Sequence, residues 1–213
     1  MVRVKICGIT NWTDARVAVK AGADALGFNF YRKSPRYIAA DEARTIAKRL
    51  PRRVVLVGVF VNASVDEVLR VARNVDLNAV QLHGEESPAE VQRLSKSYPV
   101  VKAFRAGPKF KVGHLARYGS ASAFLLDGFD RKRRGGTGKT FNWSVARAAK
   151  KYGAIIVAGG LNPENIARAI REARPFGVDV CGGVESSPGR KDAKKLRALM
   201  DEIEIVRNGW AGA

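Results

Sequence analysis

Short apolar runs alternate with longer amphipathic segments along almost the whole chain. The run 54–60 is apolar at nearly every position, which is typical of a strand covered on both faces, as in a parallel sheet. The segment 192–206 places apolar side chains at helical spacing and predicts an amphipathic helix. The alternation of the two patterns therefore predicts repeated strand–helix units.

The pattern resolves into eight such units. Strands are predicted at about 2–6, 25–30, 54–60, 78–82, 100–104, 123–127, 154–158 and 178–180. Helices are predicted at about 14–20, 41–49, 65–73, 88–96, 112–118 (the weakest pattern), 144–151, a segment that Asn162 caps and Pro163 begins, and 192–206. This count in 213 residues predicts an α/β fold, a (β/α)8 TIM barrel formed by one domain over residues 1–213.

An open, doubly wound sheet is the alternative, but it predicts a glycine-rich fingerprint after the first strand, and residues 7–12 hold only Gly8. In a barrel, functional residues lie at the carboxyl ends of the strands and in the loops that follow. The predicted strand ends supply Cys7, Asn29 with the loop 32–36, Asn62, His83, Arg105, Asp127, Gly159-Gly160 and Cys181-Gly182-Gly183.

Two glycine clusters predict a phosphate site. Gly159-Gly160 follows the seventh strand and Gly182-Gly183 the eighth, where barrels of this class hold phosphate on backbone N–H groups. The alternative is that these glycines serve only as turns. The segment 135–140 resembles a nucleotide-binding loop but has Arg133 where a glycine is required, so we expect a loop that closes over the site.

Cys7 and Asp127 are the candidate acid–base pair. They end the first and sixth strands, on opposite sides of the predicted mouth, so one could take a proton from a substrate while the other gives one. Each has a simpler interpretation: a buried cysteine that only packs, and an aspartate that caps a helix or joins an ion pair. His83 is equally open between a mouth residue and a substrate contact, and His114 is expected on a surface helix.

Composition narrows the function classes. The chain has no signal pattern or bilayer-length apolar run, and Cys7 and Cys181 form neither a disulfide framework nor a metal-ligand spacing, so we expect a cytoplasmic protein without metal or cofactor. The 38 Lys and Arg against 20 Asp and Glu give a net charge of +18. These charges are scattered except at 131–134, and no nucleic-acid motif is present, so we expect no specific nucleic-acid or membrane partner.

The motifs together resemble the phosphoribosylanthranilate isomerase family of tryptophan biosynthesis. They are Lys5-Ile6-Cys7-Gly8-Ile9-Thr10, Gly27-Phe28, Ser34-Pro35-Arg36, Val59-Phe60-Val61-Asn62, Gln81-Leu82-His83-Gly84, Leu125-Leu126-Asp127, Gly135-Gly136-Thr137-Gly138 with Phe141 and Trp143, Ala158-Gly159-Gly160-Leu161, and Gly183-Val184-Glu185 with Pro188-Gly189 and Lys191-Asp192. The resemblance covers nearly the whole chain in order.

The resemblance implies an Amadori rearrangement of N-(5-phosphoribosyl)anthranilate, with no metal or cofactor. Asp127 would be the general acid and Cys7 the general base, while Arg36 would hold the anthranilate carboxylate. We expect His83 and Asp179 to bind substrate too. The partner is then a small phosphorylated substrate, and the chain would be a monomer or a homodimer.

Two departures from the family pattern stand out. Cys181-Gly182 replaces two serines, which predicts weaker phosphate binding, and Asn142 replaces an aspartate beside the basic cluster 131–134. Cys181 could lie on the same rim as Cys7, but we expect side-chain direction and the phosphate loop to keep the two sulfurs apart. The alternatives are an indole-glycerol-phosphate synthase-like barrel, which would need a lysine at a strand end, and a basic nucleic-acid-binding protein.

Overall fold

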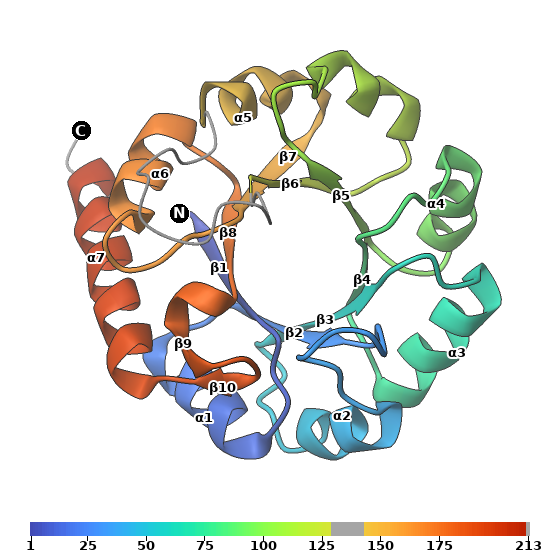
Figure 1. Cartoon of the computed structure of the whole chain (residues 1–213), viewed down its shortest axis with the longest axis horizontal. Helices are drawn as coiled ribbons and strands as arrows, with labels where there is room; N and C mark the ends of the chain where they lie inside the picture. The colour runs from blue at the N-terminus through green and yellow to red at the C-terminus, as the bar shows by residue number, and fades with distance from the viewer. Residues whose placement is uncertain (129–142, 212–213) are drawn as a thin grey trace.

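The structure is a computed structural model, which describes residues 1–128 and 143–211. Eight parallel strands close into a barrel in the order β1 to β8, and Figure 1 shows the helices as a ring outside it. The predicted (β/α)8 barrel is thus confirmed, and the open sheet is excluded because β1 pairs with both β2 and β8.

The strand bounds lie within two residues of the predicted ones. They are β1 Arg3–Cys7, β2 Ala25–Asn29, β3 Val55–Phe60, β4 Ala79–Leu82, β5 Val100–Arg105, β6 Ala123–Asp127, β7 Ala154–Ala158 and β8 Gly177–Val180. The carboxyl ends of all these strands meet at one rim, as a closed parallel barrel requires.

The helices also follow the predicted order. They are α1 Trp12–Ala21, α2 Ala40–Ala47, α3 Val65–Val75, α4 Pro88–Ser95, α5 Trp143–Ala149, α6 Ile166–Ala173 and α7 Ala193–Ala211. Short 3-10 helices are η1 Val112–Tyr118, η2 Lys150–Tyr152 and η3 Gly182–Val184. The weakest predicted helix, 112–118, is therefore present as a 3-10 helix, η1.

The prediction that Asn162 caps and Pro163 begins the helix after β7 is wrong, because α6 begins at Ile166 and its N-cap residue is Asn165. The Asn162 side chain accepts hydrogen bonds from the N–H groups of Glu164 at 3.0 Å and Asn165 at 3.1 Å. The Asn165 side chain accepts one from the N–H of Asn162 at 2.9 Å. These reciprocal side-chain bonds close a turn over 163–165, and the helix starts only after it.

Apolar side chains form two cores. The larger lies between the barrel and the helices, and the smaller fills the barrel with Ala103, Leu125 and Ala158. Lys5, Gln81 and Asp179 are also buried, although they are polar. In a strand of period two, Lys5 shares its face with Cys7, so the Lys5 side chain lies directly below the rim formed by the carboxyl ends of the strands.

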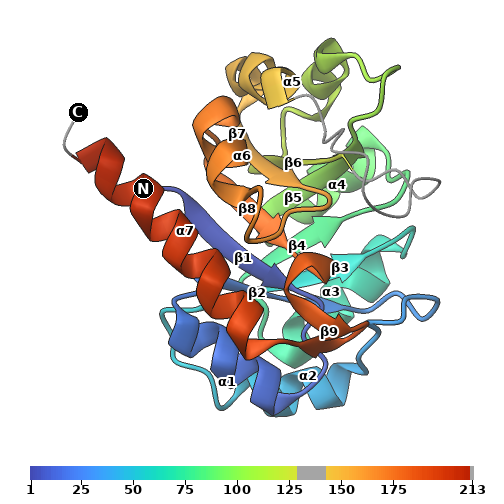
Figure 2. The same cartoon turned by 60° about the vertical axis from the view of Figure 1, so that its left-hand side comes forward.

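A hairpin after β8 was not predicted. It consists of β9 Glu185–Ser187 and β10 Arg190–Lys191, and Figure 2 shows it beside the carboxyl end of β1. The Thr10 hydroxyl donates to the carbonyl of Gly189 at 2.7 Å, and the N–H of Lys191 donates to Asp14 at 2.8 Å. The hairpin is thereby held against the loop after β1 and the first turn of α1.

In the part of the chain that the structure describes, no helix is long and apolar enough to cross a bilayer.

Candidate active site

Cys7 ends β1 on the inner side of the rim. Cys7 is 8% exposed. The chain turns away from the strand at Gly8, whose φ of +77° suits glycine. A Cβ on Gly27 would lie 2.8 Å from the Cys7 sulfur, so the neighbouring strand needs glycine there to leave the sulfur room. The N–H groups of Gly8 and Ile9 both donate to the carbonyl of Gly27 at 3.0 Å, which fixes the turn.

The expectation that the two sulfurs stay apart is wrong. Ile6 pairs with Val180 in the β1–β8 ladder, so the next residues, Cys7 and Cys181, lie side by side on the rim, where each thiol shifts the pKa of the other. A Cβ on Gly8 would lie 3.0 Å from the Cys181 sulfur, so the bare glycine leaves space for it. Both cysteines are free thiols.

The surroundings of Cys7 favour its thiolate. The pKa of Cys7 lies well below its ordinary value, and the hydrogen bond from Cys181 is the largest cause. Burial opposes this shift, while the positive charges of Lys5 and Lys191 add to it. The pKa of Cys181 is raised in turn, first by its hydrogen bond with Cys7 and then by burial. One proton thus stays on Cys181, and Cys7 is the stronger acid of the pair.

Lys5 is a site residue that the sequence reasoning missed. Its ammonium forms an ion pair with Asp179 at 2.9 Å, with both side chains nearly excluded from solvent, and it also hydrogen-bonds Cys7. Burial alone would lower the pKa of Lys5, but the charges of Asp179 and Cys7 raise it overall. The available signal was a lysine in an apolar strand, two residues before Cys7 and on the same face.

Asp179, predicted to bind substrate, lies below Cys7 in β8. Burial raises the pKa of its carboxyl to about 6, although the positive charge of Lys5 acts in the opposite direction. Its Oδ1 atom is buried and has no hydrogen-bond partner among the residues that the structure describes. One carboxylate oxygen therefore holds Lys5, and the other has no partner among the described residues.

Asp127 and His83 meet on the opposite side of the mouth. His83 Nε2 lies 3.5 Å from Asp127 Oδ2, and both side chains are about one-quarter exposed, at 28% and 24%. The amide nitrogen of the buried Gln81 lies 2.9 Å from His83 Nδ1. With this amide as the donor, the imidazole carries its proton on Nε2 and turns it toward Asp127. His83 is thus placed to orient the carboxyl group.

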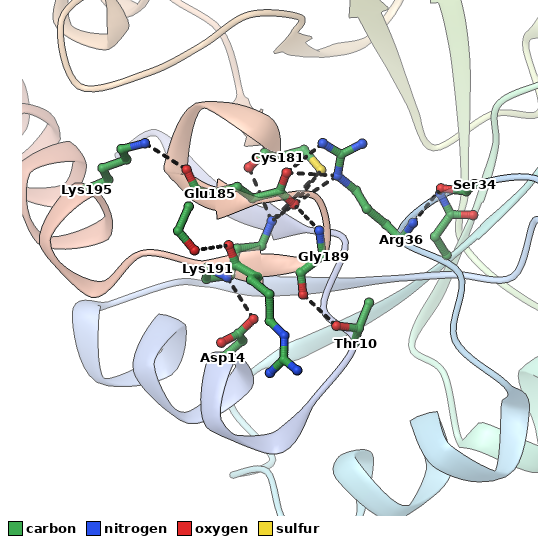
Figure 3. Close-up of polar contacts among 12 residues, drawn as sticks. Thr10, Asp14, Ser34, Arg36, Cys181, Glu185, Gly189, Lys191 and Lys195 are labelled. Carbon is green, nitrogen blue, oxygen red and sulfur yellow. Dashed lines mark hydrogen bonds and ion pairs between the residues drawn. The ribbon is translucent and has the colours of Figure 1, made fainter.

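Arg36, in the loop after β2, is held by Glu185 from the hairpin. Its Nε lies 2.9 Å and 3.1 Å from the two carboxylate oxygens, and its Nη2 lies 2.6 Å from Oε2, as Figure 3 shows. The backbone N–H of Arg36 donates to the Ser34 hydroxyl at 3.1 Å. Glu185 is a second site residue that sequence reasoning placed only in a motif and gave no role.

The two predicted phosphate loops come together. A Cβ on Gly183 would collide with the carbonyl oxygen of Leu161, so the loop after β8 rests on the loop after β7. Gly159 and Gly160 have φ of +92° and +67°, and a Cβ on Gly160 would meet no atom within 4 Å. Gly182 begins η3, the kind of short extra helix found at phosphate sites in barrels.

Some predicted features lie outside the described residues. They are the basic cluster 131–134, the glycine-rich loop 135–140, Phe141 and Asn142. Of the residues that are described, no three or more His, Cys, Asp or Glu lie together as metal ligands would.

The chain matches a family of known proteins over most of its length. Residues 4–202 match the family model described as N-(5′-phosphoribosyl)anthranilate (PRA) isomerase. A relative of that name from Citrifermentans bemidjiense is 51% identical over 206 residues, which cover 97% of this chain and 98% of the relative. One from Geobacter sulfurreducens is 48% identical over 210 residues, covering 99% of this chain and 100% of the relative.

Solved structures give the same result. The crystal structure of phosphoribosyl anthranilate isomerase from Thermotoga maritima has a TM-score of 0.89 at 44% identity and covers 96% of this chain and 99% of that one. A phosphoribosyl anthranilate isomerase in complex with reduced 1-(o-carboxyphenylamino)-1-deoxyribulose 5-phosphate has a TM-score of 0.86 at 42% identity, with coverage of 96% and 99%.

Proposed function

The chain belongs to the N-(5′-phosphoribosyl)anthranilate isomerase family, and from this premise we propose that it works in tryptophan biosynthesis through an acid–base pair formed by Asp127 and Cys7. The reaction converts N-(5-phosphoribosyl)anthranilate to 1-(2-carboxyphenylamino)-1-deoxyribulose 5-phosphate. The observation that carries the assignment of roles is Cys7 itself, a thiol at the barrel mouth whose surroundings stabilise its anion.

The first step opens the ribose ring. Asp127 gives its proton to the ring oxygen, the bond between C1 and that oxygen breaks, and the lone pair of the anilino nitrogen forms a C1=N double bond. The product is a protonated Schiff base, and Asp127 is left as a carboxylate. His83, 3.5 Å from Asp127, orients the acid and stabilises the carboxylate that forms.

The second step moves a proton from carbon. The Cys7 thiolate removes the proton on C2, the C2–H electron pair forms a C1=C2 double bond, and the C1=N electrons return to nitrogen. The resulting enolamine tautomerises to the ketone when C1 gains a proton and the C2 hydroxyl loses one. Because Lys5 compensates the negative charge on Cys7, the base is ready before the substrate binds.

The two ends of the substrate fit two different parts of the mouth. We propose that the phosphate lies on the backbone of Gly159, Gly160, Gly182 and Gly183, and that the anthranilate carboxylate lies on Arg36. A Cβ on Gly182 would be 3.4 Å from Arg36 Nη2, so these two anion sites share one rim. The unpartnered oxygen of Asp179 is suited to a substrate hydroxyl.

We further propose that the chain acts in the cytoplasm as one domain over residues 1–213, as a monomer or homodimer, and without a specific nucleic-acid partner. Monomers generated from the dimeric phosphoribosylanthranilate isomerase of Thermotoga maritima have a solved structure, so that relative supports either assembly state here.

Turnover by the purified chain tests the proposal. Conversion of N-(5-phosphoribosyl)anthranilate is followed by the change in anthranilate fluorescence for the parent chain, Cys7→Ser and Asp127→Asn. Each variant is expected to lose about a hundredfold or more in kcat. A mild loss in either variant removes that residue from its role. No turnover by the parent chain, together with tight and salt-sensitive RNA binding, would overturn the enzyme assignment.

A further inference from the structure

Glu185 is an acidic residue in the middle of a site meant for anions. Its side chain is 5% exposed, and both of its oxygens contact Arg36, the residue proposed to bind the substrate carboxylate. A carboxylate beside an anion site repels the anion and weakens its binding. The contacts of Glu185 indicate which role offsets this repulsion.

Glu185 is itself held in place from behind. The Lys191 ammonium, whose side chain is fully buried, contacts Glu185 Oε1 at 2.9 Å and the Cys181 carbonyl at 3.2 Å. The N–H of Gly189 donates to the same Oε1 at 3.3 Å (Figure 3). Although burial would raise the pKa of Glu185, hydrogen bonds from Arg36 and Lys191 lower it overall, so the group is anionic at neutral pH.

The contacts with Glu185 leave the Nη1–Nη2 edge of Arg36 without a hydrogen bond to the described residues. Glu185 uses the Nε–H and one N–H of Nη2, while the two N–H groups of Nη1 and the second of Nη2 are not directed at it.

We propose that Glu185 is a positioning residue that sets specificity for the carboxylated substrate, because it clamps the Arg36 guanidinium with its Nη1–Nη2 edge presented to the anthranilate carboxylate. The proposal rests on the proposed function, in which Arg36 binds that carboxylate. A fixed fork loses little side-chain entropy when its ligand arrives, whereas a free arginine must be ordered first. The clamp therefore acts on substrate binding rather than on the proton transfers.

A pair of substrates tests this. The first is N-(5-phosphoribosyl)anthranilate and the second is N-(5-phosphoribosyl)aniline, which carries hydrogen in place of the carboxylate. Glu185→Gln removes the negative charge and replaces one of the two accepting oxygens with an NH2 group, a donor that cannot bind Arg36 or Lys191. We expect KM for the anthranilate substrate to rise about tenfold with kcat within about threefold, and kcat/KM for the aniline substrate to stay unchanged.

A purely structural role would give a different pattern. Equal losses of kcat/KM on both substrates, or no loss on either, would overturn the inference. If Glu185→Gln does not fold, Glu185→Asp keeps the charge but is too short for the two-nitrogen contact, and the same selective rise in KM is expected. Thermal unfolding of each variant, measured beside the kinetics, shows that the folded state is the one assayed.

Arg36→Met separates this inference from the proposed function. If Arg36→Met keeps the parent preference for the carboxylated substrate, the assignment of Arg36 fails and the clamp fails with it. If Arg36→Met loses the preference while Glu185→Gln keeps it, Arg36 binds the carboxylate unaided, and only the role of Glu185 is wrong.

Discussion

The thiol of Cys181 hydrogen-bonds the sulfur of Cys7 across the β1–β8 junction. This contact joins the proposed catalytic base to a residue that stands where the family usually has a serine. It lowers the pKa of Cys7 more than any other neighbour does. The base therefore depends on a residue that takes no direct part in the proposed reaction.

Cys181→Ala is expected to raise the pKa of Cys7. The variant removes the largest lowering cause and leaves Lys5 and Lys191 to compensate the thiolate alone. The rate of alkylation of Cys7 by iodoacetamide, read from peptide masses across a pH series, should reach half its maximum about one pH unit or more above the parent value. The acid limb of kcat/KM should shift in the same direction.

Cys181→Ser is the matched control for that substitution. Its hydroxyl keeps a donor at nearly the same place, so the alkylation midpoint should stay closer to that of the parent chain than to that of Cys181→Ala. If the three proteins share one midpoint, the hydrogen bond from Cys181 does not set the acidity of Cys7.

Mild oxidation should join the two cysteines. A peroxide oxidises the Cys7 thiolate to a sulfenic acid and is reduced to water, and the Cys181 thiol then forms the disulfide with release of a second water. Adjacent strands lie about 4.8 Å apart, which falls within the Cα separations that disulfides span. We expect activity to fall as a cross-linked peptide carrying Cys7 and Cys181 appears, and a thiol reductant to restore it.

Cys181→Ser again supplies the control. It has no second thiol, so peroxide should leave Cys7 as a sulfenic acid that is oxidised further, and reductant should recover progressively less activity with time. Full recovery in this variant after long exposure, or the absence of the cross-linked peptide from the parent chain, would contradict the predicted disulfide.

Most of the barrel could be predicted, because each strand is a short apolar run and each helix has one apolar and one polar face. Cys7, Asp127 and the glycine loops followed from the rule that function lies at strand ends. Glu185 could not be given a role in this way. Its partner Arg36 is 149 residues away, and they meet through a hairpin whose strands are only three and two residues long. Such short strands have no recognisable period.

The approach of the two cysteine side chains was harder still to predict. The strand order made Cys7 and Cys181 neighbours, but whether two rim side chains meet depends on how the chain leaves the strand. Here, space beside Gly8 admits the Cys181 sulfur. Lys5, in contrast, was visible in the sequence as a charge within an apolar strand, and period two placed it on the face of Cys7.

The buried carboxyl of Asp179 makes stability depend on pH. Its pKa is about 6 in the folded chain against an ordinary 3.8, so the folded state binds the proton more tightly than the unfolded state does. Ionisation of Asp179 should therefore lower the free energy of unfolding by on the order of 3 kcal/mol as the pH rises from about 4 to about 6. Above about pH 6 this contribution should not change further.

Denaturant unfolding at several pH values measures this effect. Asp179→Asn does not titrate, so its stability should lack the decrease between about pH 4 and 6 that the parent shows. Because the neutral amide resembles the protonated carboxyl, its stability should stay near the low-pH value of the parent chain and exceed that of the parent above this range. Equal slopes in the two proteins would show that the Asp179 carboxyl is ionised throughout.

A side chain added at Gly182 should strengthen phosphate binding, whereas one added at Gly183 should weaken it. A Cβ on Gly182 meets only ordinary contacts, 3.4 Å from Arg36 and 3.9 Å from Glu185, so Gly182→Ser fits and restores one of the hydroxyls that the family usually has. A hydrogen bond to a charged group contributes about 1.5–3 kcal/mol, so KM and the inhibition constant of inorganic phosphate should both fall, by about tenfold.

Gly183→Ala should weaken phosphate binding, because its Cβ would collide with the Leu161 carbonyl and push the loop after β8 away from the loop after β7. Overpacking of this kind costs about 1–3 kcal/mol, so the thermal midpoint should fall and phosphate should inhibit more weakly. The comparison isolates the loop contact, since both variants add a side chain to one short 3-10 helix. If Gly182→Ser leaves phosphate inhibition unchanged, the glycine backbone already binds the phosphate fully, and the missing serines cost the protein nothing.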